Sequence, residues 1–238
     1  MKFKVRILII FFALLFSFCG SAFAVGHDSK FIKVVFVGNY RCGKTAIWRR
    51  TLNQDFDPDL PKSDSLTFAQ KTIQENDTTL ILKIWDTAGL DKYYNEMVDF
   101  TKNANFVFIV HDMEEKYDES VEQYLDKIYR DVSDKIAKDG KIVFVGSKID
   151  TKKRSIVNYT KQAELIKAVA KHIPCHLILT SAKTGYGIAD IMLYIKEQSK
   201  EMELLDIDVN FQDNVKKFDA DILERTIYVE KGYTCSIL

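Results

Sequence analysis

The feature that most constrains this chain is a glycine-rich turn between an apolar strand and a helical segment. Residues 31–37 are apolar apart from Lys33, which favours a buried strand, and residues 44–52 have helical spacing. Between them lies a G-x-x-x-x-G-K-T motif, Gly38-Asn39-Tyr40-Arg41-Cys42-Gly43-Lys44-Thr45. In such a motif backbone N–H groups and a helix N-terminus wrap a phosphate, the lysine reaches phosphate oxygens, and the threonine holds Mg2+. We expect phosphate binding here; the alternative is a glycine turn with a solvated lysine.

The rest of the chain alternates apolar runs with helical patterns. We expect strands at 66–73, 79–85, 106–110, 141–145 and 176–179, and helices at 120–137, 161–171 and 188–200. The segment Glu75-Asn76-Asp77 indicates a hairpin between the first two of these strands. This order predicts an α/β fold with a mostly parallel six-stranded sheet, one antiparallel edge strand, and helices on both faces.

The composition excludes several classes of protein. The chain has 238 residues, with 34 Lys and Arg balancing 34 Asp and Glu, which suits one ordinary domain with extensions and excludes collagen-like, disordered and polytopic membrane proteins. A zero net charge argues against nucleic acid as a partner, because phosphate backbones are bound through an excess of basic residues. The four cysteines lack C-x-x-C spacing, so we expect neither a disulfide scaffold nor a zinc site.

Three further motifs follow expected strands. They are Asp86-Thr87-Ala88-Gly89, Ser147-Lys148-Ile149-Asp150 and Ser181-Ala182-Lys183. Binding sites in parallel sheets lie at the carboxyl ends of the strands, so all these segments are expected to meet the glycine-rich loop. A carboxylate at Asp86 can hold Mg2+ through water, and the Gly89 N–H can meet a terminal phosphate.

In order and spacing these motifs resemble the small GTPases of the Ras superfamily, and most of all the Rab family, over residues 31–200. The residues that carry the resemblance are the glycine-rich loop, Ile84–Gly89, Val145–Asp150, Val157-Asn158-Tyr159-Thr160 and Thr180–Lys183. The resemblance implies a P-loop NTPase fold of Ras-like type, GTP or GDP with Mg2+ as cofactors, and hydrolysis of GTP to GDP and phosphate. It also implies a molecular switch that acts on membrane trafficking or signalling.

The resemblance assigns roles to individual residues. Asp150 would pair with guanine N1 and N2, Lys148 would lie along the base, and the Ala182 N–H would meet O6. Phe56 stands where the family places an aromatic ring against the base. The expected Mg2+ ligands are Thr45, Asp86 and the switch residue Ser63, for which Ser65 is an alternative. The expected nucleotide-binding residues are Gly38, Asn39, Tyr40, Arg41, Cys42, Gly43, Lys44, Thr45, Ala46, Phe56, Gly89, Ser147, Lys148, Asp150, Ser181, Ala182 and Lys183.

The expected catalytic residues are Lys44, Leu90 and Arg41, and the last two of these depart from the family pattern. Leu90 occupies the position of the glutamine that orients the attacking water. Leucine neither donates nor accepts a hydrogen bond, so we expect slow GTP hydrolysis. Tyr40 is expected to crowd an arginine finger supplied by an activator, which would make the protein insensitive to such activators. Two alternatives remain open: Arg41 as an internal charge stabiliser, or Asp91 as the residue that positions water.

Another departure is Ser147, which stands where the family usually has Asn. Serine lacks the amide that contacts the base and braces the glycine-rich loop. We therefore expect guanine preference to persist through Asp150, with some loss of affinity. Two other functions stay possible: a P-loop phosphotransferase that uses ATP, and a pseudo-GTPase adaptor. Effector or regulator proteins are expected to bind the loops around Ser63 and Tyr93, and the protein is expected to be a monomer.

The two ends of the chain point to membranes in different ways. Residues 1–24 have the charged, apolar, small-residue order of a signal peptide cleaved after Ala24, with an uncleaved membrane anchor or a buried helix as the alternatives. Residues 201–238 form an acidic tail with nine acidic and four basic residues. The tail ends in Cys235-Ser236-Ile237-Leu238, a prenylation motif of geranylgeranyl type or else a free terminal cysteine.

The expected domains are therefore 1–24, a GTPase domain at 25–200, and the tail at 201–238. The expected location is the cytoplasmic face of a membrane, or outside the cell or inside a host cell if the N-terminal signal is used.

Overall fold

The computed structural model describes residues 28–60, 65–75, 78–115, 118–150 and 176–202. In chain order its elements are β1 (Asp28–Gly38), α2 (Lys44–Thr51), β2 (Thr67–Glu75), β3 (Thr78–Asp86), the 3-10 turn η1 (Asp91–Tyr93), α3 (Tyr94–Phe100), β4 (Phe106–Asp112), α4 (Glu119–Ser133), β5 (Lys141–Ser147), β6 (His176–Leu179) and α6 (Ile188–Gln198).

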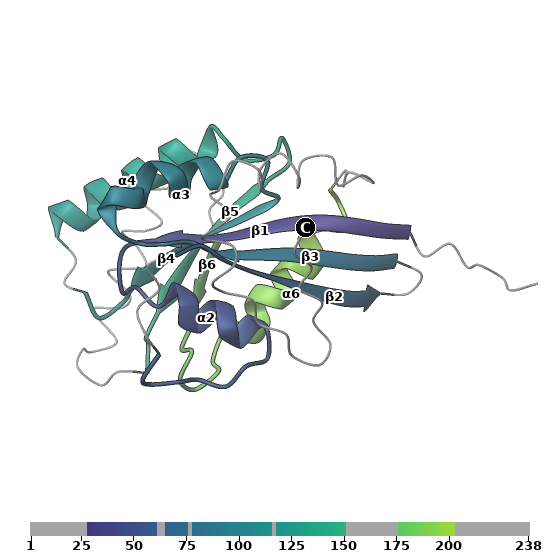
Figure 1. Ribbon diagram of the computed structural model, residues 1–238, viewed down its shortest axis with the longest axis horizontal. Helices are drawn as coiled ribbons and strands as arrows, with labels where there is room; N and C mark the ends of the chain where they lie inside the picture. The colour runs from purple at the N-terminus through teal and green to yellow at the C-terminus, as the bar shows by residue number, and fades with distance from the viewer. Residues whose placement is uncertain (1–27, 61–64, 76–77, 116–117, 151–175, 203–238) are drawn as a thin grey trace, which may run out of the picture.

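The strands form one six-stranded sheet in the order β2-β3-β1-β4-β5-β6. Neighbouring strands from β3 to β6 are parallel, and β2 pairs antiparallel with β3, with Thr67 opposite Asp86. The carboxyl ends of the parallel strands therefore lie together along one side of the sheet, on the left in Figure 1. The predicted fold class is confirmed, including the antiparallel edge strand.

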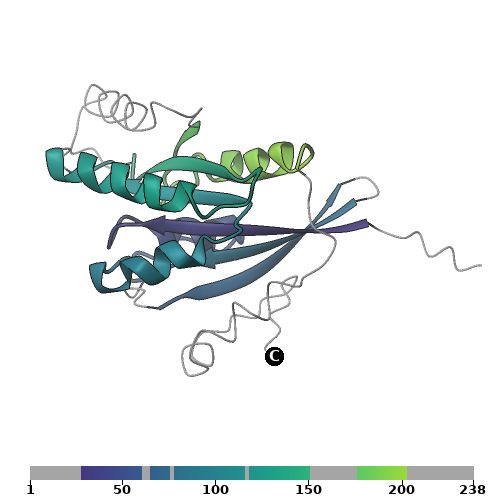
Figure 2. The same cartoon turned by 90° about the horizontal axis from the view of Figure 1, so that it is seen from above.

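The apolar run in β1 is explained by helices on both faces of the sheet. Ile32, Val34 and Phe36 point into the core with α2 and α6, whereas Val35 and Val37 point into the core with α3 and α4. Figures 1 and 2 show these two layers from perpendicular directions. Because successive side chains of a strand alternate between faces, a strand covered on both faces reads as continuously apolar.

Aromatic packing fixes the carboxyl end of β3. The ring of Trp85 lies 4.4 Å from that of Phe68 on β2 and 4.7 Å from that of Phe100 on α3, measured between centroids. All three side chains belong to the α3 and α4 side of the sheet. Asp86 is the next residue, so its backbone position is set by buried packing rather than by a mobile loop.

The helices differ from expectation chiefly at α3, α4 and α6. Helix α3 was not predicted, and α6 ends at Gln198 rather than residue 200. Helix α4 ends at Ser133 rather than 137, because the next residues bond with the loop before β4: Asn103 N–H donates to Lys135 O, and Ala137 N–H donates to Ala104 O. The expected helix at 161–171 lies outside the described residues. Among the helices that the structure describes, none has the length and apolar character to span a bilayer.

Candidate functional site

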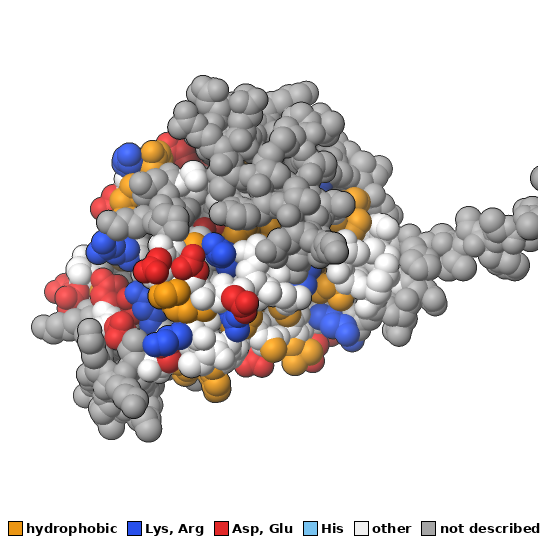
Figure 3. Space-filling model, turned by 60° about the horizontal axis from the view of Figure 1, so that its bottom comes forward, with side chains coloured by type: hydrophobic (Ala, Val, Ile, Leu, Met, Phe, Trp, Pro, Cys, Tyr) orange, Lys and Arg blue, Asp and Glu red, His pale blue; other side chains and the backbone are white. Residues whose placement is uncertain are grey.

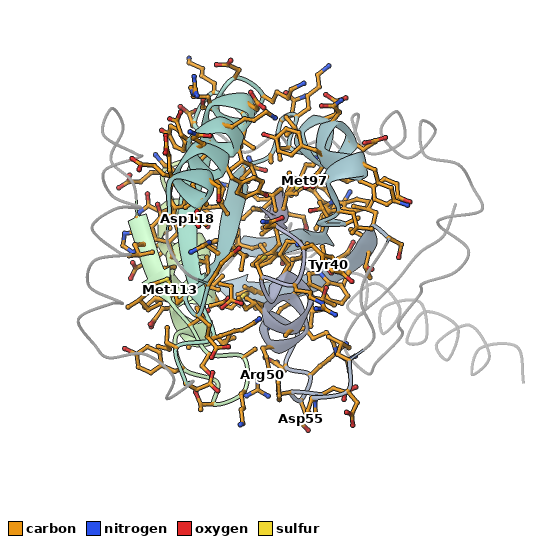
Figure 4. The ribbon with its side chains drawn as sticks, turned by 90° about the vertical axis from the view of Figure 1, so that its left-hand side faces the viewer. Tyr40, Arg50, Asp55, Met97, Met113 and Asp118 are labelled. Atoms are coloured by element: carbon orange, nitrogen blue, oxygen red, sulfur yellow. The ribbon has the colours of Figure 1, made fainter. Side chains whose placement is uncertain are left out.

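The glycine-rich loop curls back at the end of β1, on the edge of the sheet that Figure 4 views directly. Three of its residues have positive φ: Gly38 at 143°, Arg41 at 61° and Gly43 at 95°. A Cβ atom at Gly38 would collide with the carbonyl oxygen of Val110 on β4. Glycine is therefore required at position 38. Arg41 adopts a left-handed backbone conformation, which is unfavourable for residues other than glycine.

Lys44 lies inside the loop and begins helix α2. It is only 6% exposed, and its Nζ donates to Gly38 O at 3.0 Å and to Asn39 O at 2.9 Å. The Asn39 Oδ1 accepts from the Tyr40 N–H at 2.9 Å, which stiffens the turn. Among the described residues, no side chain caps the N-terminus of α2. Its first backbone N–H groups are thus available to an anion, as phosphate-binding helices require.

Thr45 and Asp86 form the part of the site suited to a metal ion. Thr45 Oγ1 donates to Asp86 Oδ2 at 2.6 Å, whereas the buried Asp86 Oδ1 has no hydrogen-bond partner among the described residues. Burial raises the pKa of Asp86 to about 6, against the opposing effects of the Lys44 charge and the Thr45 hydrogen bond. A buried carboxylate oxygen without a donor beside a hydroxyl fits Mg2+, which is usually held by one or two such groups plus phosphates.

Gly89 closes on the same loop from the segment after β3. A Cβ atom at Gly89 would lie 2.5 Å from Lys44 Nζ and 2.8 Å from Asn39 O, so only glycine permits this approach. The preceding Thr87 is fastened to β1, because its N–H and its Oγ1 both donate to Phe36 O, at 3.3 and 2.8 Å. The fold thus brings the segment of residues 86–89 against the glycine-rich loop, as its position at the end of a strand predicted.

The segments after β5 and β6 also meet at this edge. Ser181 Oγ donates to Asp150 Oδ1 at 2.6 Å and accepts from the Thr184 N–H at 3.1 Å. Ser181 is fully buried, and the Ile149 N–H donates to Thr180 O at 3.3 Å. The Asp150 carboxylate is therefore held in one orientation by a neighbouring loop, as expected of a group that recognises a planar base.

Ser147 corrects one sequence-based expectation. We expected that serine in place of asparagine would fail to brace the glycine-rich loop. The Ser147 side chain is buried, and its Oγ donates to Cys42 O at 2.5 Å and lies 3.1 Å from His111 O. The brace is kept because a short hydroxyl reaches the loop carbonyl directly.

Lys148 has a partner that sequence reasoning missed. Its Nζ donates to Asp112 Oδ2 at 2.7 Å, and its backbone has a positive φ of 60°. Asp112 is the last residue of β4. The sequence motifs place site residues at the carboxyl ends of the other parallel strands but none at the end of β4. The position of Asp112 at the end of a strand could have identified it as a site residue, since the carboxyl ends of all the parallel strands lie at the same side of the sheet.

The structure also describes most of the remaining expected residues. Arg41 is exposed, with its guanidinium carbon 5.4 Å from the centroid of the Tyr40 ring, and Figure 4 labels Tyr40 at this edge. Cys42 is buried, and burial raises the pKa of its thiol. Leu90 is half-buried, and its carbonyl accepts from the Tyr93 N–H at 2.9 Å. The half-buried residues Ala46, Phe56 and Ala182 and the exposed Lys183 are described, whereas Ser63 lies outside the described residues.

Metal clusters of another kind are not found in the part of the chain that the structure describes. There, no group of three or more His, Cys, Asp or Glu side chains is arranged to hold a metal ion. The Mg2+ ligands expected from the sequence include only one such side chain, Asp86, so this finding does not bear on them.

Comparisons with known proteins agree with this arrangement. The human "EF-hand calcium-binding domain-containing protein 4B" is 24% identical over 190 residues, which cover 78% of this chain and 24% of that protein. The chain thus spans about a quarter of the length of this relative. The sequence also matches the Ras family over residues 33–201, more than half of its length. This match includes the glycine-rich loop, Asp86 and Asp150, and it shows that the chain belongs to the Ras family of small GTPases, whose members generally bind guanine nucleotides with Mg2+.

Proposed function

We propose that this chain is a Rab-like GTP-binding switch that hydrolyses GTP slowly and acts on membrane trafficking or signalling. The observation that supports the proposal is that residues suited to bind phosphate and metal lie together, while a leucine occupies the position of the catalytic glutamine. Lys44, Thr45 and Asp86 lie together as binding requires. Leu90, four residues after Asp86, replaces the group that would orient water.

Nucleotide binding in this proposal uses groups that the fold already positions. The loop N–H groups and Lys44 bind the β and γ phosphates, and the Gly89 N–H meets the γ-phosphate. Thr45 and Asp86 hold Mg2+, which neutralises phosphate charge when it is bound. Asp150, oriented by Ser181 at 2.6 Å, recognises guanine.

Slow hydrolysis follows from the chemistry of the residues around the γ-phosphate. The Leu90 side chain offers no donor or acceptor, so it cannot hold a water molecule in line for attack. Tyr40 places a large ring in the glycine-rich loop, where it would hinder an arginine finger from an activator. Arg41 lies over that ring and is exposed, which favours a surface role over an internal charge stabiliser. A GTP-loaded protein would then persist, and effectors would bind near Tyr93 and the Ser63 loop.

Single-turnover GTP hydrolysis tests the catalytic part of the proposal. We expect Leu90→Gln to raise the rate at least about tenfold, because one aligned catalytic group is worth roughly 10²–10⁴ in rate. Leu90→Ala is the matched control, since it removes the leucine without supplying an amide, and it should leave the rate unchanged. The proposal of impaired hydrolysis is wrong if the unmodified protein is as fast as Leu90→Gln, or if both variants behave alike.

Identification of the nucleotide tests the binding part. We expect protein purified without added nucleotide to contain one GTP or GDP per chain, and excess GTP but not ATP to displace a fluorescent GDP analogue. Displacement by ATP would favour the P-loop phosphotransferase instead. The absence of nucleotide together with a failure to bind either analogue would favour the pseudo-GTPase adaptor.

Membrane association through either end is also proposed, although both ends lie outside the described residues. The two ends imply different compartments, because a cleaved signal peptide exports a protein whereas prenylation of Cys235 takes place in the cytosol. An uncleaved anchor, or delivery into a host cell followed by lipidation, would reconcile them. Intact-mass measurement of the native protein separates these cases, since loss of residues 1–24 and gain of a prenyl group both change the mass.

A further inference from the structure

The carboxylate of Asp112, at the end of β4, is held on both of its oxygens. Oδ1 accepts from the Glu114 N–H at 2.8 Å, and Oδ2 accepts from Lys148 Nζ at 2.7 Å. The Asp112 backbone carbonyl accepts from the Glu115 N–H at 3.1 Å, which completes a turn directly after the strand. An aspartate side chain that accepts from a backbone N–H two residues on is fixed by its own turn. Asp112 therefore presents Oδ2 to Lys148 in one orientation.

The strand that leads to Lys148 is fastened beside Asp112. Strands β4 and β5 pair in parallel with Asp112 opposite Ser147, the residue before Lys148. The Met113 N–H donates to Ser147 O at 3.1 Å, and Ser147 Oγ lies 3.1 Å from His111 O. Figure 4 labels Met113 where these strands end. The distance between the backbones of Asp112 and Lys148 is thus set by the sheet and not by the two side chains.

The Lys148 side chain passes beside the glycine-rich loop. A Cβ atom at Gly43 would lie 3.9 Å from Lys148 Cε and 3.5 Å from Ser147 Oγ. The Lys148 side chain is 36% exposed and that of Asp112 is 17% exposed. Water and salt screen a partly buried ion pair less than one on the surface. The ammonium group is therefore held between two parts of the site, the end of β4 and the glycine-rich loop.

A lysine ammonium group stands on a flexible stem, so fixing it in one place costs conformational entropy. A partner that fixes the group before the ligand arrives removes this cost from binding. We infer that Asp112 is a positioning residue for guanine nucleotides, because it holds Lys148 beside the glycine-rich loop in the place where the base lies along it. This inference rests on the proposed function, which supplies the base. It adds to the site a residue of β4, the parallel strand that no sequence motif follows.

Release of a fluorescent GDP analogue from the full chain tests this inference. Lys148→Met keeps the apolar stem and removes the ammonium group, whereas Asp112→Asn leaves one oxygen for two donors. We expect each variant to release the analogue about tenfold faster than the unmodified protein, the lower end of the effect of losing a hydrogen bond between charged groups. The double variant should release it no faster than Lys148→Met does, because Asp112 acts through Lys148.

Asp99→Asn is the matched control. Asp99 forms an ion pair with Lys135 at 2.6 Å. The Asn103 N–H, in the loop before β4, donates to Lys135 O, so this pair lies near the amino end of β4 and not near its carboxyl end. Asp99→Asn removes a carboxylate from the same kind of pair and should release the analogue at the unmodified rate. Release as fast as that of Asp112→Asn would overturn the inference, because loss of any such pair would then suffice.

The preference for GDP over IDP separates the positioning of Lys148 from damage to the rest of the site. IDP lacks the exocyclic amine of guanine, which Asp150 recognises in the proposed function, whereas Lys148 lies along a ring that both nucleotides share. Asp112→Asn should therefore weaken GDP and IDP by the same factor when each competes with the fluorescent analogue. Loss of the preference would mean that the substitution disturbs Asp150, and the inference would be wrong.

The outcomes for this inference and for the proposed function differ. The inference is wrong if the effects of Asp112→Asn and Lys148→Met multiply in the double variant, or if Asp112→Asn folds and releases the analogue as the unmodified protein does. Either result leaves guanine nucleotide binding intact. If the unmodified protein binds neither GDP nor IDP, the proposed function fails, and the inference fails with it.

The melting temperature of each variant shows whether it is folded. If Asp112→Asn does not fold, Asp112→Ser takes its place in every comparison. Serine keeps a short acceptor for the Glu114 N–H and removes the carboxylate that faces Lys148.

Discussion

At the residue scale, the surroundings of Asp86 differ between its two carboxylate oxygens. Oδ2 accepts from Thr45 at 2.6 Å, whereas Oδ1 is buried without a hydrogen-bond partner among the described residues. Leaving a buried acceptor unsatisfied costs free energy, and burial also raises the pKa of this carboxyl group. The presence of a carboxylate that destabilises the protein in this way is best explained by a bound ligand that interacts with its negative charge.

A substitution of Asp86 tests that explanation. Asp86→Asn keeps the size and the Thr45 hydrogen bond but removes the charge. We expect the affinity for Mg2+ to fall about 10–100-fold in the variant, the usual loss when a group that holds a metal indirectly is removed. A correspondingly higher Mg2+ concentration would then be needed to slow GDP release. Stopped-flow release of a fluorescent GDP analogue measures this effect. With EDTA present the two proteins should release GDP equally fast, and a difference that persists there would mean that Asp86 acts on the fold rather than on the metal.

The sequence predicted residues of the site unequally well. The Lys44, Asp86 and Asp150 positions were identified because each belongs to a motif of known chemistry that begins at the carboxyl end of a strand. The Asp112 contact with Lys148, and the Ser147 contact with Cys42, were not. Those pairs are 36 and 105 residues apart in the chain, so they depend on which strands lie side by side.

At the element scale, the start of α4 rests on one side chain. Asp118 Oδ1 accepts from the Ser120 N–H at 3.0 Å and from the Val121 N–H at 3.3 Å, which caps the helix. We expect Asp118→Ala to lower the free energy of unfolding by about 1 kcal/mol, the usual cost of losing an N-cap. Denaturation in urea measures the loss. Asp118→Asn keeps a capping oxygen and should lose only a few tenths of that amount, so equal losses in both variants would argue against the cap.

The elements that the sequence missed are short or end through tertiary contacts. Helix α3 has only seven residues, so its apolar spacing at Tyr94, Met97 and Val98 is too brief to distinguish it from a loop. Strands were easier to recognise because burial on both faces makes them continuously apolar. The end of α4 was set by bonds of residues 135 and 137 to a distant loop, which no local pattern contains.

At the scale of the whole molecule, the zero net charge is the sum of three different parts. Residues 1–24 have three basic and no acidic residues, residues 25–200 have 27 basic and 25 acidic, and residues 201–238 have four basic and nine acidic. On the face of the domain in Figure 3, acidic and basic side chains lie next to one another. The near-neutral central part is the one that carries the nucleotide site, and the charged segments are the ones proposed to reach a membrane.

Ligand binding should stabilise the whole domain, because the site joins segments from β1, β3, β5 and β6. At a GDP concentration about 100 times its Kd with Mg2+, linkage predicts about 2.7 kcal/mol of added stability. For a domain of this size that corresponds to a rise in Tm of roughly 5–10 °C. Differential scanning fluorimetry with GDP, and with ADP as the matched control, measures the shift. An equal shift with ADP would contradict guanine specificity.

The sequence by itself determined the fold class, the order of the strands and the binding motifs, because each depends on local spacing: apolar runs in strands, glycine at positive φ, and a helix directly after a loop. The tertiary structure decided which side chains meet. Parallel pairing placed Asp112 beside Lys148 and Ser147 beneath the glycine-rich loop, and packing of α3 on α4 brought Tyr94 to Asp131. Contacts between residues far apart in the chain form only when the whole domain buries its apolar surface, and no local sequence pattern records that.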